Sequence, residues 1–329
     1  MIIKSSTLFG NPIVSVVITS FNRGQTIGNA LDSILNQQHV FPIEIIVGDD
    51  FSDDDSRKVL LQYHEKYPQN IVLLFHEKNL GLVGNWASCV QLSRGKYIAF
   101  CDDDDYWCDN EKLRKQISFL EDNPDFGLIH TNYNKYYEKS NRIVSANLLF
   151  NKEPENLMLA IFKGQYLINP GTVCVRMDLV KNHIYLDDYI KNKFPIQDFP
   201  TWIILAKYTK FAYINDITYM YRMGVESMSN PTSYSKIETK FLKEKEMYKY
   251  LCDKFPEDLH YDEQGYNNYI TRILLSLAYK KSDFVSAKKY GNILLLSGDK
   301  TLKAKSSKYK LLFLGLFWAI KIKSLFSNK

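Results

Sequence analysis

Four consecutive aspartates, Asp102–Asp105, directly follow the apolar run at residues 96–101. Each ionised carboxylate raises the cost of ionising its neighbours unless a positive charge lies among them. Such a run is either a solvated acidic turn or a site for a divalent cation. Mg²⁺ and Mn²⁺ prefer oxygen ligands, commonly one or two carboxylates completed by phosphate oxygens and water. The spacing of Asp102 and Asp104 therefore suits a cation held against a diphosphate.

The faces on which these carboxylates lie follow from the expected backbone. Side chains of an extended chain alternate between opposite faces. If the strand continues through the run, Asp102 and Asp104 share one face and Asp103 and Asp105 share the other. The alternation thus predicts two separate pairs of carboxylates.

Two further polar segments follow apolar runs in the same way. The run at 13–19 leads into Thr19–Gly24, "TSFNRG", and the run at 43–48 leads into Gly48–Asp55, "GDDFSDDD". The carboxyl ends of parallel strands meet at one edge of a sheet, where ligands bind. We therefore expect both segments to converge with Asp102–Asp105 on a single site.

The elements that must position these segments alternate between strand and helix. Strands that are apolar on both faces and separated by helices indicate a mostly parallel sheet covered on both sides. The expected strands are 13–19, 43–48, 71–75 and 96–101, and the expected helices are 26–37, 53–67 and 83–92. In the less regular second half we expect a strand at 172–176, a helix at 198–208 and two short strands at 211–214 and 217–222.

The chain from about Ser233 onward is expected to be helical. Within it, residues 274–295 are similar to a helical hairpin of the tetratricopeptide kind. One such unit cannot form a solenoid, because a solenoid needs several stacked repeats. The hairpin is therefore interpreted as part of a helical extension.

The composition is that of an ordinary globular protein, with 45% hydrophobic and 24% charged residues in 329. The five cysteines lack metal-site spacing and are expected to be free thiols in a reducing compartment. The first residues lack the apolar core of a secretion signal, and no run of about 18 apolar residues predicts a membrane span. We therefore expect a cytoplasmic protein.

The net charge of +5 is concentrated at the C-terminus, because residues 301–329 contain seven Lys and no acidic residue. Residues 311–320 are apolar and include Phe and Trp. Two interpretations remain open for this tail: peripheral contact with an anionic membrane at the inner face of the cell membrane, or a terminal helix packed on the body. The remaining sequence lacks a basic and aromatic groove pattern, so nucleic acid is not an expected partner.

Four segments in order along the chain resemble family 2 glycosyltransferases of the GT-A fold, in particular bacterial enzymes that build capsule, O-antigen or other surface polysaccharides. The segments are residues 14–37, 43–54, 79–86 and 95–132. The resemblance extends over about residues 12–230. It implies an α/β, Rossmann-like GT-A domain at 1–232 and a helical C-terminal region at 233–329. It further implies an inverting transfer of a sugar from a nucleotide-diphosphate donor, a UDP-sugar, to a saccharide or lipid-linked acceptor.

The resemblance also implies roles for the donor-facing residues. Thr19, Phe21 and Arg23 match the wall around the nucleobase and diphosphate, and Asp50 matches an acceptor for a uracil N–H. The remaining positions that match nucleotide contacts are Lys78, Asn79, Asp102 near the ribose, and Asp103, which could equally face solvent.

The positions that match the reacting centre are Asp104, Asp105 and Asp198. The resemblance places Mn²⁺ or Mg²⁺ on Asp104 and Asp105. In "PIQDFPTWIILA", residues 195–206, Asp198 matches the general base at the head of a helix. An aspartate at a helix start is also an ordinary cap, so the two interpretations of Asp198 stay open.

Three departures from the family pattern matter. Phe51 stands where a Gly is usual, Gln197 replaces a Glu, and Gly224 lies where many relatives offer a His as a third metal ligand. They leave open an alternative function, a catalytically inactive relative that acts as a binding or assembly subunit. A nucleotidyltransferase would need a Gly-rich phosphate loop, and "TSFNRGQT" is a poor one.

Overall fold

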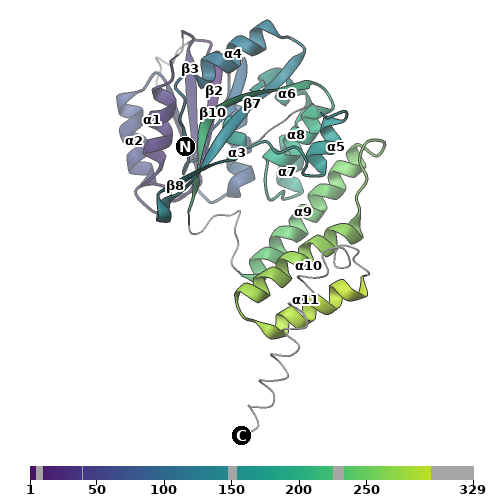
Figure 1. The fold of residues 1–329 in the computed structure, drawn as a ribbon. Coiled ribbons are helices and arrows are strands. Elements are labelled where there is room, and N and C mark those ends of the chain that lie inside the picture. Colours follow the sequence, from purple (N-terminus) through teal and green to yellow (C-terminus); the bar gives the residue numbers. More distant parts are fainter. Residues whose placement is uncertain (5–9, 39, 147–153, 225–232, 298–329) are drawn as a thin grey trace. The chain divides into compact units, whose positions relative to one another are not determined.

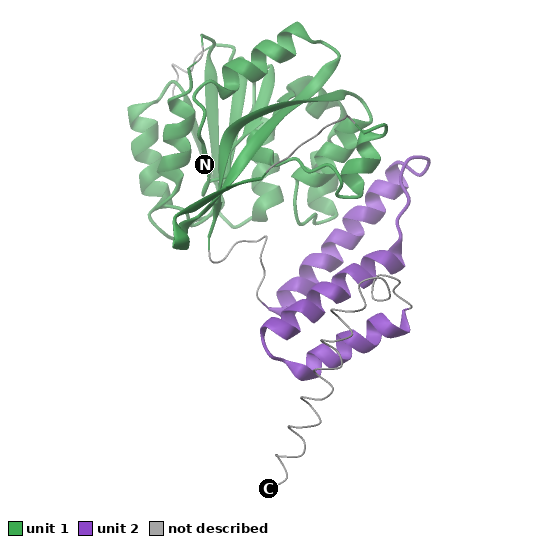
Figure 2. Cartoon of the chain, in the orientation of Figure 1, with its two compact units in different colours: residues 1–227 green, residues 228–329 purple. Residues whose placement is uncertain are grey.

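The structure is a computed structural model that describes residues 1–4, 10–38, 40–146, 154–224 and 233–297 (Figure 1). The chain divides into two compact units, residues 1–227 and residues 228–329 (Figure 2). The boundary predicted from the sequence lies between residues 232 and 233. The basic tail at 301–329, with its apolar run at 311–320, lies outside the described residues. Within the described ranges, no helix is both long and apolar enough to cross a membrane.

The first unit is built on one sheet. Its strands are β1 (Ile2–Ile3), β2 (Val14–Ser20), β3 (Ile43–Asp49), β4 (Ile71–Phe75), β5 (Tyr97–Phe100), β6 (Tyr106–Trp107), β7 (Phe126–Tyr137), β8 (Arg142–Ser145), β9 (Cys174–Arg176) and β10 (Lys210–Met223). Their order is β1-β4-β3-β2-β5-β9-β7-β10-β6, with β8 paired to β7. The strands β2 to β5 run parallel, as do β7 and β10, whereas β9 runs antiparallel between β5 and β7. The predicted mostly parallel sheet is confirmed.

Helices cover both faces of this sheet. They are α1 (Ile27–Leu35), α2 (Ser56–Lys66), α3 (Gly81–Leu92), α4 (Lys112–Asp122), α5 (Leu157–Phe162), α6 (Met177–His183), α7 (Leu186–Lys191) and α8 (Asp198–Ala206). Figure 1 shows α1 and α2 on one side of the sheet and α3 with α6–α8 on the other. Burial of both faces explains why every residue of β3 and β4 is buried and why β4 is apolar throughout.

The packing of α1 shows how the sequence pattern produces this layer. Its buried residues are Ile27, Ala30, Leu31 and Ile34, which recur at the helical spacing of three and four. They pack with alternate residues of β2, Val14, Val16 and Ile18, in one hydrophobic core. The side chains on one face of β2 therefore fix α1 directly after the polar loop at 21–26.

The predicted strand pair at 211–214 and 217–222 is wrong, because one strand, β10, runs through both segments. Its pairing with β7 shifts register between Ile214 and Ile217 and again between Ile217 and Tyr219. A β-bulge therefore accommodates the polar residues that the sequence suggests as a break. This continuity matters for the site, because β10 leads directly from the bulge to the acidic run.

The second unit is helical in its described part, as predicted. Its helices are α9 (Tyr234–Lys254), α10 (Glu263–Lys280) and α11 (Phe284–Leu296). Side chains of Ser233, Asp262 and Asp283 each accept a backbone N–H at the helix starts. The helices α10 and α11 form the predicted hairpin and share a hydrophobic core with α9.

Candidate functional site

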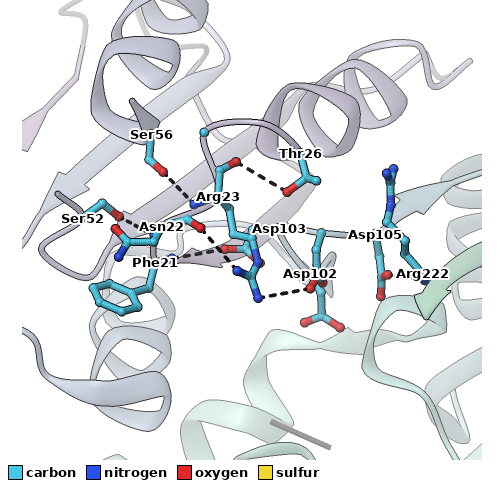
Figure 3. A network of polar contacts seen from close by, with 12 residues as sticks. Phe21, Asn22, Arg23, Thr26, Ser52, Ser56, Asp102, Asp103, Asp105 and Arg222 are labelled. Atoms are coloured by element: carbon cyan, nitrogen blue, oxygen red, sulfur yellow. Dashed lines mark hydrogen bonds and ion pairs between the residues drawn. The ribbon is translucent and has the colours of Figure 1, made fainter. Parts of the chain in front are cut away.

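Three polar loops meet at the carboxyl ends of β2, β3 and β5, as the sequence predicts. The loop after β2 is bound to the loop after β3 by backbone N–H groups, with Asn22 donating to Ser52 Oγ at 2.9 Å and Arg23 donating to Ser56 Oγ at 2.8 Å. The loop after β5 joins them, because the Phe21 N–H donates to Asp103 Oδ2 at 3.2 Å (Figure 3). This edge lies where β3 and β5 flank β2, which is the usual ligand position in such sheets.

Sequence reasoning missed the residues that bind these loops together. Ser52, Asp54 and Ser56 accept hydrogen bonds from the backbone of residues 22–24. Their signal is present in "GDDFSDDDS", because Asp and Ser side chains commonly bond to neighbouring backbone in turns. The density of these residues could therefore have indicated an ordered loop rather than a purely ligand-facing one.

The acidic run is a turn, so the predicted alternation of its side chains is wrong. The chain turns at Asp103 and Asp104, and this brings Asp102 and Asp105 together at the hydroxyl of Tyr219. The other two carboxylates lie near the Arg23 guanidinium, at 3.7 Å for Asp103 and 3.5 Å for Asp104. The carboxylates thus pair as 102 with 105 and 103 with 104.

The acidic turn carries negative charge that the protein only partly offsets. Burial, followed by the charge of Asp104, raises the pKa of Asp102 to about 7. The same two causes raise the pKa of Asp103 to about 8, although Arg23 opposes the shift. Burial and the neighbouring Asp102 raise the pKa of Asp105 well above its ordinary value. A positive ligand at this turn would therefore be favoured electrostatically.

The carboxylate oxygens of the turn fit a divalent cation whose remaining ligands are phosphate oxygens and water. Among the described residues, no three His, Cys, Asp or Glu side chains gather as a metal site. One or two carboxylates with phosphate oxygens and water are sufficient for Mg²⁺. Asp104 suits this role, because its side chain is 34% exposed and its partner Arg23 is 3.5 Å away. Gly224 supplies no side-chain ligand.

Asp105 is placed differently from Asp104. Its Oδ2 accepts from the Tyr219 hydroxyl and its Oδ1 accepts from the Arg222 N–H at 2.6 Å. Asp105 is fully buried, and each of its oxygens accepts from one of these two protein donors. Its role as a cation ligand stays a prediction, and the geometry favours a different role.

The aspartates at the end of β3 are held by the protein itself. Asp49 is fully buried and accepts from Arg57 Nε at 2.6 Å. Asp50 accepts from the backbone N–H groups of Leu80 at 2.6 Å and Gly81 at 2.8 Å, at the start of α3. The predicted contact of Asp50 with uracil would have to share oxygens that already bind backbone.

The other predicted nucleotide contacts surround this edge. Thr19 is half-buried at the end of β2, and Lys78 and Asn79 are exposed before α3. Asn79 Nδ2 also donates to the Asp50 carbonyl at 3.1 Å. Phe21 is 46% exposed on the loop after β2, so its ring is accessible to a ligand.

Phe51 is unusual in both its backbone and its exposure. Its φ of +67° lies in the left-handed region, which a residue with a side chain seldom adopts. The ring is 50% exposed and lies 5.5 Å from the Arg57 guanidinium. The position therefore has a backbone conformation that suits Gly but carries an exposed aromatic ring.

Asp198 is brought to the acidic turn from far along the sequence. It is half-buried in the first turn of α8, and its charge contributes to the raised pKa of Asp102. The helix is fixed by Trp202, which is 3% exposed and packs edge-on against Phe100 of β5 with ring centroids 6.2 Å apart. The carboxylate predicted as a base thus lies near the carboxylates predicted to face the donor.

Comparison with known proteins identifies the family. The family described as "Glycosyl transferase family 2" has a sequence model that matches residues 15–180, half of the chain. The chain therefore belongs to glycosyltransferase family 2. The predicted resemblance is confirmed.

Relatives extend over different lengths of the chain. An uncharacterized protein of Mycobacterium tuberculosis is 36% identical over 112 residues, which are 34% of this chain and 32% of that protein. The match therefore spans about a third of the mycobacterial relative's length. The putative teichuronic acid biosynthesis glycosyltransferase TuaG of Bacillus subtilis is 29% identical over 220 residues, 67% of this chain and 82% of TuaG. WfaP of Escherichia coli, described as a UDP-Glc:alpha-D-GlcNAc-diphosphoundecaprenol beta-1,3-glucosyltransferase, is 28% identical over 223 residues, 66% of this chain and 80% of WfaP.

Solved structures share the fold. S. aureus TarS 1-349 in complex with UDP-GlcNAc has a TM-score of 0.54 and is 18% identical, covering 81% of this chain and 72% of that chain. The complex of the same protein with UDP has a TM-score of 0.51 at 16% identity, covering 88% and 91%. The predicted GT-A fold is confirmed by this likeness.

Proposed function

We propose that the protein is an inverting glycosyltransferase that moves a sugar from a nucleotide-diphosphate donor, a UDP-sugar, to a saccharide or lipid-linked acceptor. The product belongs to a surface polysaccharide. The observation that carries the proposal is the incompletely neutralised acidic turn at the edge where the β2, β3 and β5 loops meet. The activities described for the relatives TuaG and WfaP support the polysaccharide assignment.

The roles of the residues follow from their positions at this edge. Phe21 and Phe51 offer exposed rings to the nucleobase, and Arg23 offers a guanidinium to the diphosphate. Asp102 and Asp104 would hold Mn²⁺ or Mg²⁺. When bound, the cation neutralises the charge that develops on the leaving diphosphate.

Asp198 is proposed as the general base. A sugar hydroxyl is a weak nucleophile near neutral pH, and a positioned base accelerates its attack by about 10²–10⁴-fold. Asp198 removes the proton from the acceptor hydroxyl as that oxygen bonds to the anomeric carbon. Attack opposite to the departing diphosphate inverts the anomeric centre.

The alternative function is that of a catalytically inactive relative that acts as a binding or assembly subunit. Its support is Gln197, which stands where the family pattern has Glu; its side-chain Oε1 is buried without a hydrogen-bond partner. Wild-type protein that binds UDP tightly but transfers no sugar from any UDP-sugar would favour this alternative.

The test of the donor site is calorimetric titration of the wild-type protein with UDP, GDP and dTDP, each with and without Mn²⁺. We expect UDP to bind most tightly and Mn²⁺ to strengthen its binding. Tighter binding of GDP or dTDP would indicate a different donor nucleotide and would still support a glycosyltransferase. Failure of all three nucleotides to bind would contradict the proposal.

We also propose that the protein is cytoplasmic and contacts the membrane peripherally through residues 301–329. The support is their seven Lys and the apolar run at 311–320. Full-length protein should sediment with vesicles that contain anionic lipid, and a variant that ends at residue 300 should not. Equal sedimentation of the two proteins would contradict this proposal.

A further inference from the structure

A tyrosine from the second half of the sheet lies between two carboxylates of the acidic turn. Tyr219, on β10, is fully buried, and its hydroxyl donates to Asp102 Oδ2 at 3.1 Å and to Asp105 Oδ2. The second oxygen of Asp105 accepts from the Arg222 N–H, three residues further along β10. Asp105 therefore binds to β10 at two points, whereas Asp102 is reached by the tyrosine hydroxyl alone among these donors.

The ring of Tyr219 has little freedom to move. On one side β10 pairs with β6, where Tyr219 lies opposite Trp107, and on the other side it pairs with β7, where Tyr219 lies opposite Tyr133. A Cβ atom placed on Gly171 would come within 2.1 Å of the tyrosine ring, so the ring packs directly on that backbone. The hydroxyl is thus held at a fixed point of the sheet.

Among the described residues, the other side-chain contacts of the acidic turn reach the loop after β2, where the Phe21 N–H donates to Asp103 Oδ2 at 3.2 Å. Asp103 and Asp104 are near Arg23, but their separations of 3.7 Å and 3.5 Å are longer than a normal hydrogen bond. The Arg23 side chain is 38% exposed, which leaves it free to turn toward a ligand. Among the described residues, Tyr219 and Arg222 therefore make the least exposed side-chain contacts of the turn.

We propose that Tyr219 and Asp105 are positioning residues that hold Asp102 toward the donor and its cation, and that Asp105 is not a cation ligand. This inference rests on the proposed function. Asp105 anchors the turn on β10, and the Tyr219 hydroxyl sets the direction of the Asp102 carboxylate. Partners of this kind, behind the ligands, commonly change metal affinity by about 10–100-fold when they are removed.

The first test is Tyr219→Phe, which removes the hydroxyl and keeps the ring that packs on Gly171. Mn²⁺ is titrated calorimetrically into protein saturated with UDP. We expect the Kd for Mn²⁺ to rise about 10-fold or more, while the Kd for UDP without Mn²⁺ stays unchanged. The matched control is Tyr213→Phe on the same strand, whose hydroxyl bonds to Asn215 at 2.8 Å, and its Mn²⁺ affinity should equal that of the wild type.

A second variant separates positioning from ligation. Asp105→Asn retains an oxygen that can still accept from one of its two donors, so it should weaken Mn²⁺ binding without abolishing it. Asp104→Asn should abolish the Mn²⁺ response. Combining Tyr219→Phe with Asp105→Asn should weaken Mn²⁺ binding less than the product of the two single effects, because both residues act through one connection. Asp105→Asn also decides the question if Tyr219→Phe does not fold.

Three results would overturn the inference. In the first, the wild type shows a Mn²⁺ response and folded Tyr219→Phe keeps the same Mn²⁺ affinity. In the second, Tyr219→Phe loses UDP affinity equally with and without Mn²⁺, which indicates a general structural role. In the third, Asp105→Asn abolishes the Mn²⁺ response as Asp104→Asn does, which makes Asp105 a ligand. If wild-type protein binds no nucleotide, the proposed function fails, and this inference fails with it.

Discussion

Aspartates at the ends of β3 and β5, the two strands that flank β2, have opposite surroundings. At the end of β3, Asp49 binds Arg57 at 2.6 Å and Asp50 binds two backbone N–H groups. At the end of β5, Asp102 and Asp103 have pKa values raised to about 7 and about 8 by burial and by neighbouring charge. Protein groups thus bind the aspartates at the end of β3, whereas the aspartates at the end of β5 repel one another.

This difference teaches which carboxylates stabilise the fold and which are available to a ligand. A buried carboxylate that a protein cation or backbone N–H groups bind stabilises the structure, and its removal leaves those groups unsatisfied. A carboxylate in a repelling group costs stability, so its retention points to a ligand that offsets the cost. The comparison predicts that substitutions of the aspartates at the end of β3 lower the stability of the fold, whereas substitutions at the end of β5 mainly change ligand binding.

The largest effect is expected at Asp198, which faces the acidic turn from α8. Asp198→Ala should lower kcat of sugar transfer by about 10²–10⁴-fold, because the acceptor hydroxyl loses its base. The Kd for UDP with Mn²⁺ should stay near the wild-type value. Asp187→Ala is the control, because Asp187 is an exposed acid in the first turn of the neighbouring α7. Loss of UDP binding together with transfer would point to a structural role for Asp198.

The comparison itself is tested by a matched pair, Asp49→Asn and Asp104→Asn. The first variant removes the charge of the buried carboxylate that binds Arg57 and should lower the free energy of unfolding by about 2–3 kcal/mol. The second relieves repulsion at a partly exposed site and should change it by about 0.5 kcal/mol or less. Urea unfolding measures both. Equal destabilisation by the two variants would contradict the inferred difference between the aspartates of β3 and those of the acidic turn.

A smaller effect is expected at Asp50. Asp50→Ala leaves the N–H groups of Leu80 and Gly81 at the start of α3 without their acceptor, which should cost about 1–2 kcal/mol of stability. Urea unfolding of this variant beside Asp53→Ala, a change on the same loop, measures the cost. An Asp50→Ala protein as stable as the wild type would show that this acceptor does not stabilise α3.

The last expected effect is a dependence of stability on pH. The pKa of Asp103 is raised from the ordinary value of 3.8 to about 8 in the folded protein. The folded state therefore binds the proton more tightly than the unfolded state, so the stability of cation-free protein falls as pH rises through this range. Asp103→Asn should therefore make Tm depend less on pH between about 4 and 8. An Asp103→Asn protein whose Tm falls as steeply as that of the wild type would exclude this carboxyl as the cause.

The sheet and the location of the site could be predicted because their signals are local. Apolar runs that end in "TSFNRG", "GDDFSDDD" and the four aspartates gave the three loops that meet at one edge. The directions of individual carboxylates could not be predicted in this way. The turn at Asp103 reverses the expected faces, and the partners of Asp105 lie on β10, more than 100 residues away in sequence.

The residues of the site that sequence reasoning missed also lie far along the chain from the acidic turn. Tyr219 and Arg222 lie after a bulge in β10 that shifts their register, so neither periodicity nor spacing places them at the acidic turn. Asp198 could be identified only through the family resemblance, because an aspartate at a helix start is also an ordinary cap. Its nearness to Asp102 depends on the packing of Trp202 against Phe100.

The most direct test of the central claim, that the acidic turn holds a cation against the donor, is UDP titration of wild-type and Asp104→Asn protein with and without Mn²⁺. The account predicts that Mn²⁺ strengthens UDP binding to the wild type and has no effect on binding to Asp104→Asn. The two proteins should bind UDP alone with similar affinity. A full Mn²⁺ response in folded Asp104→Asn would contradict the claim.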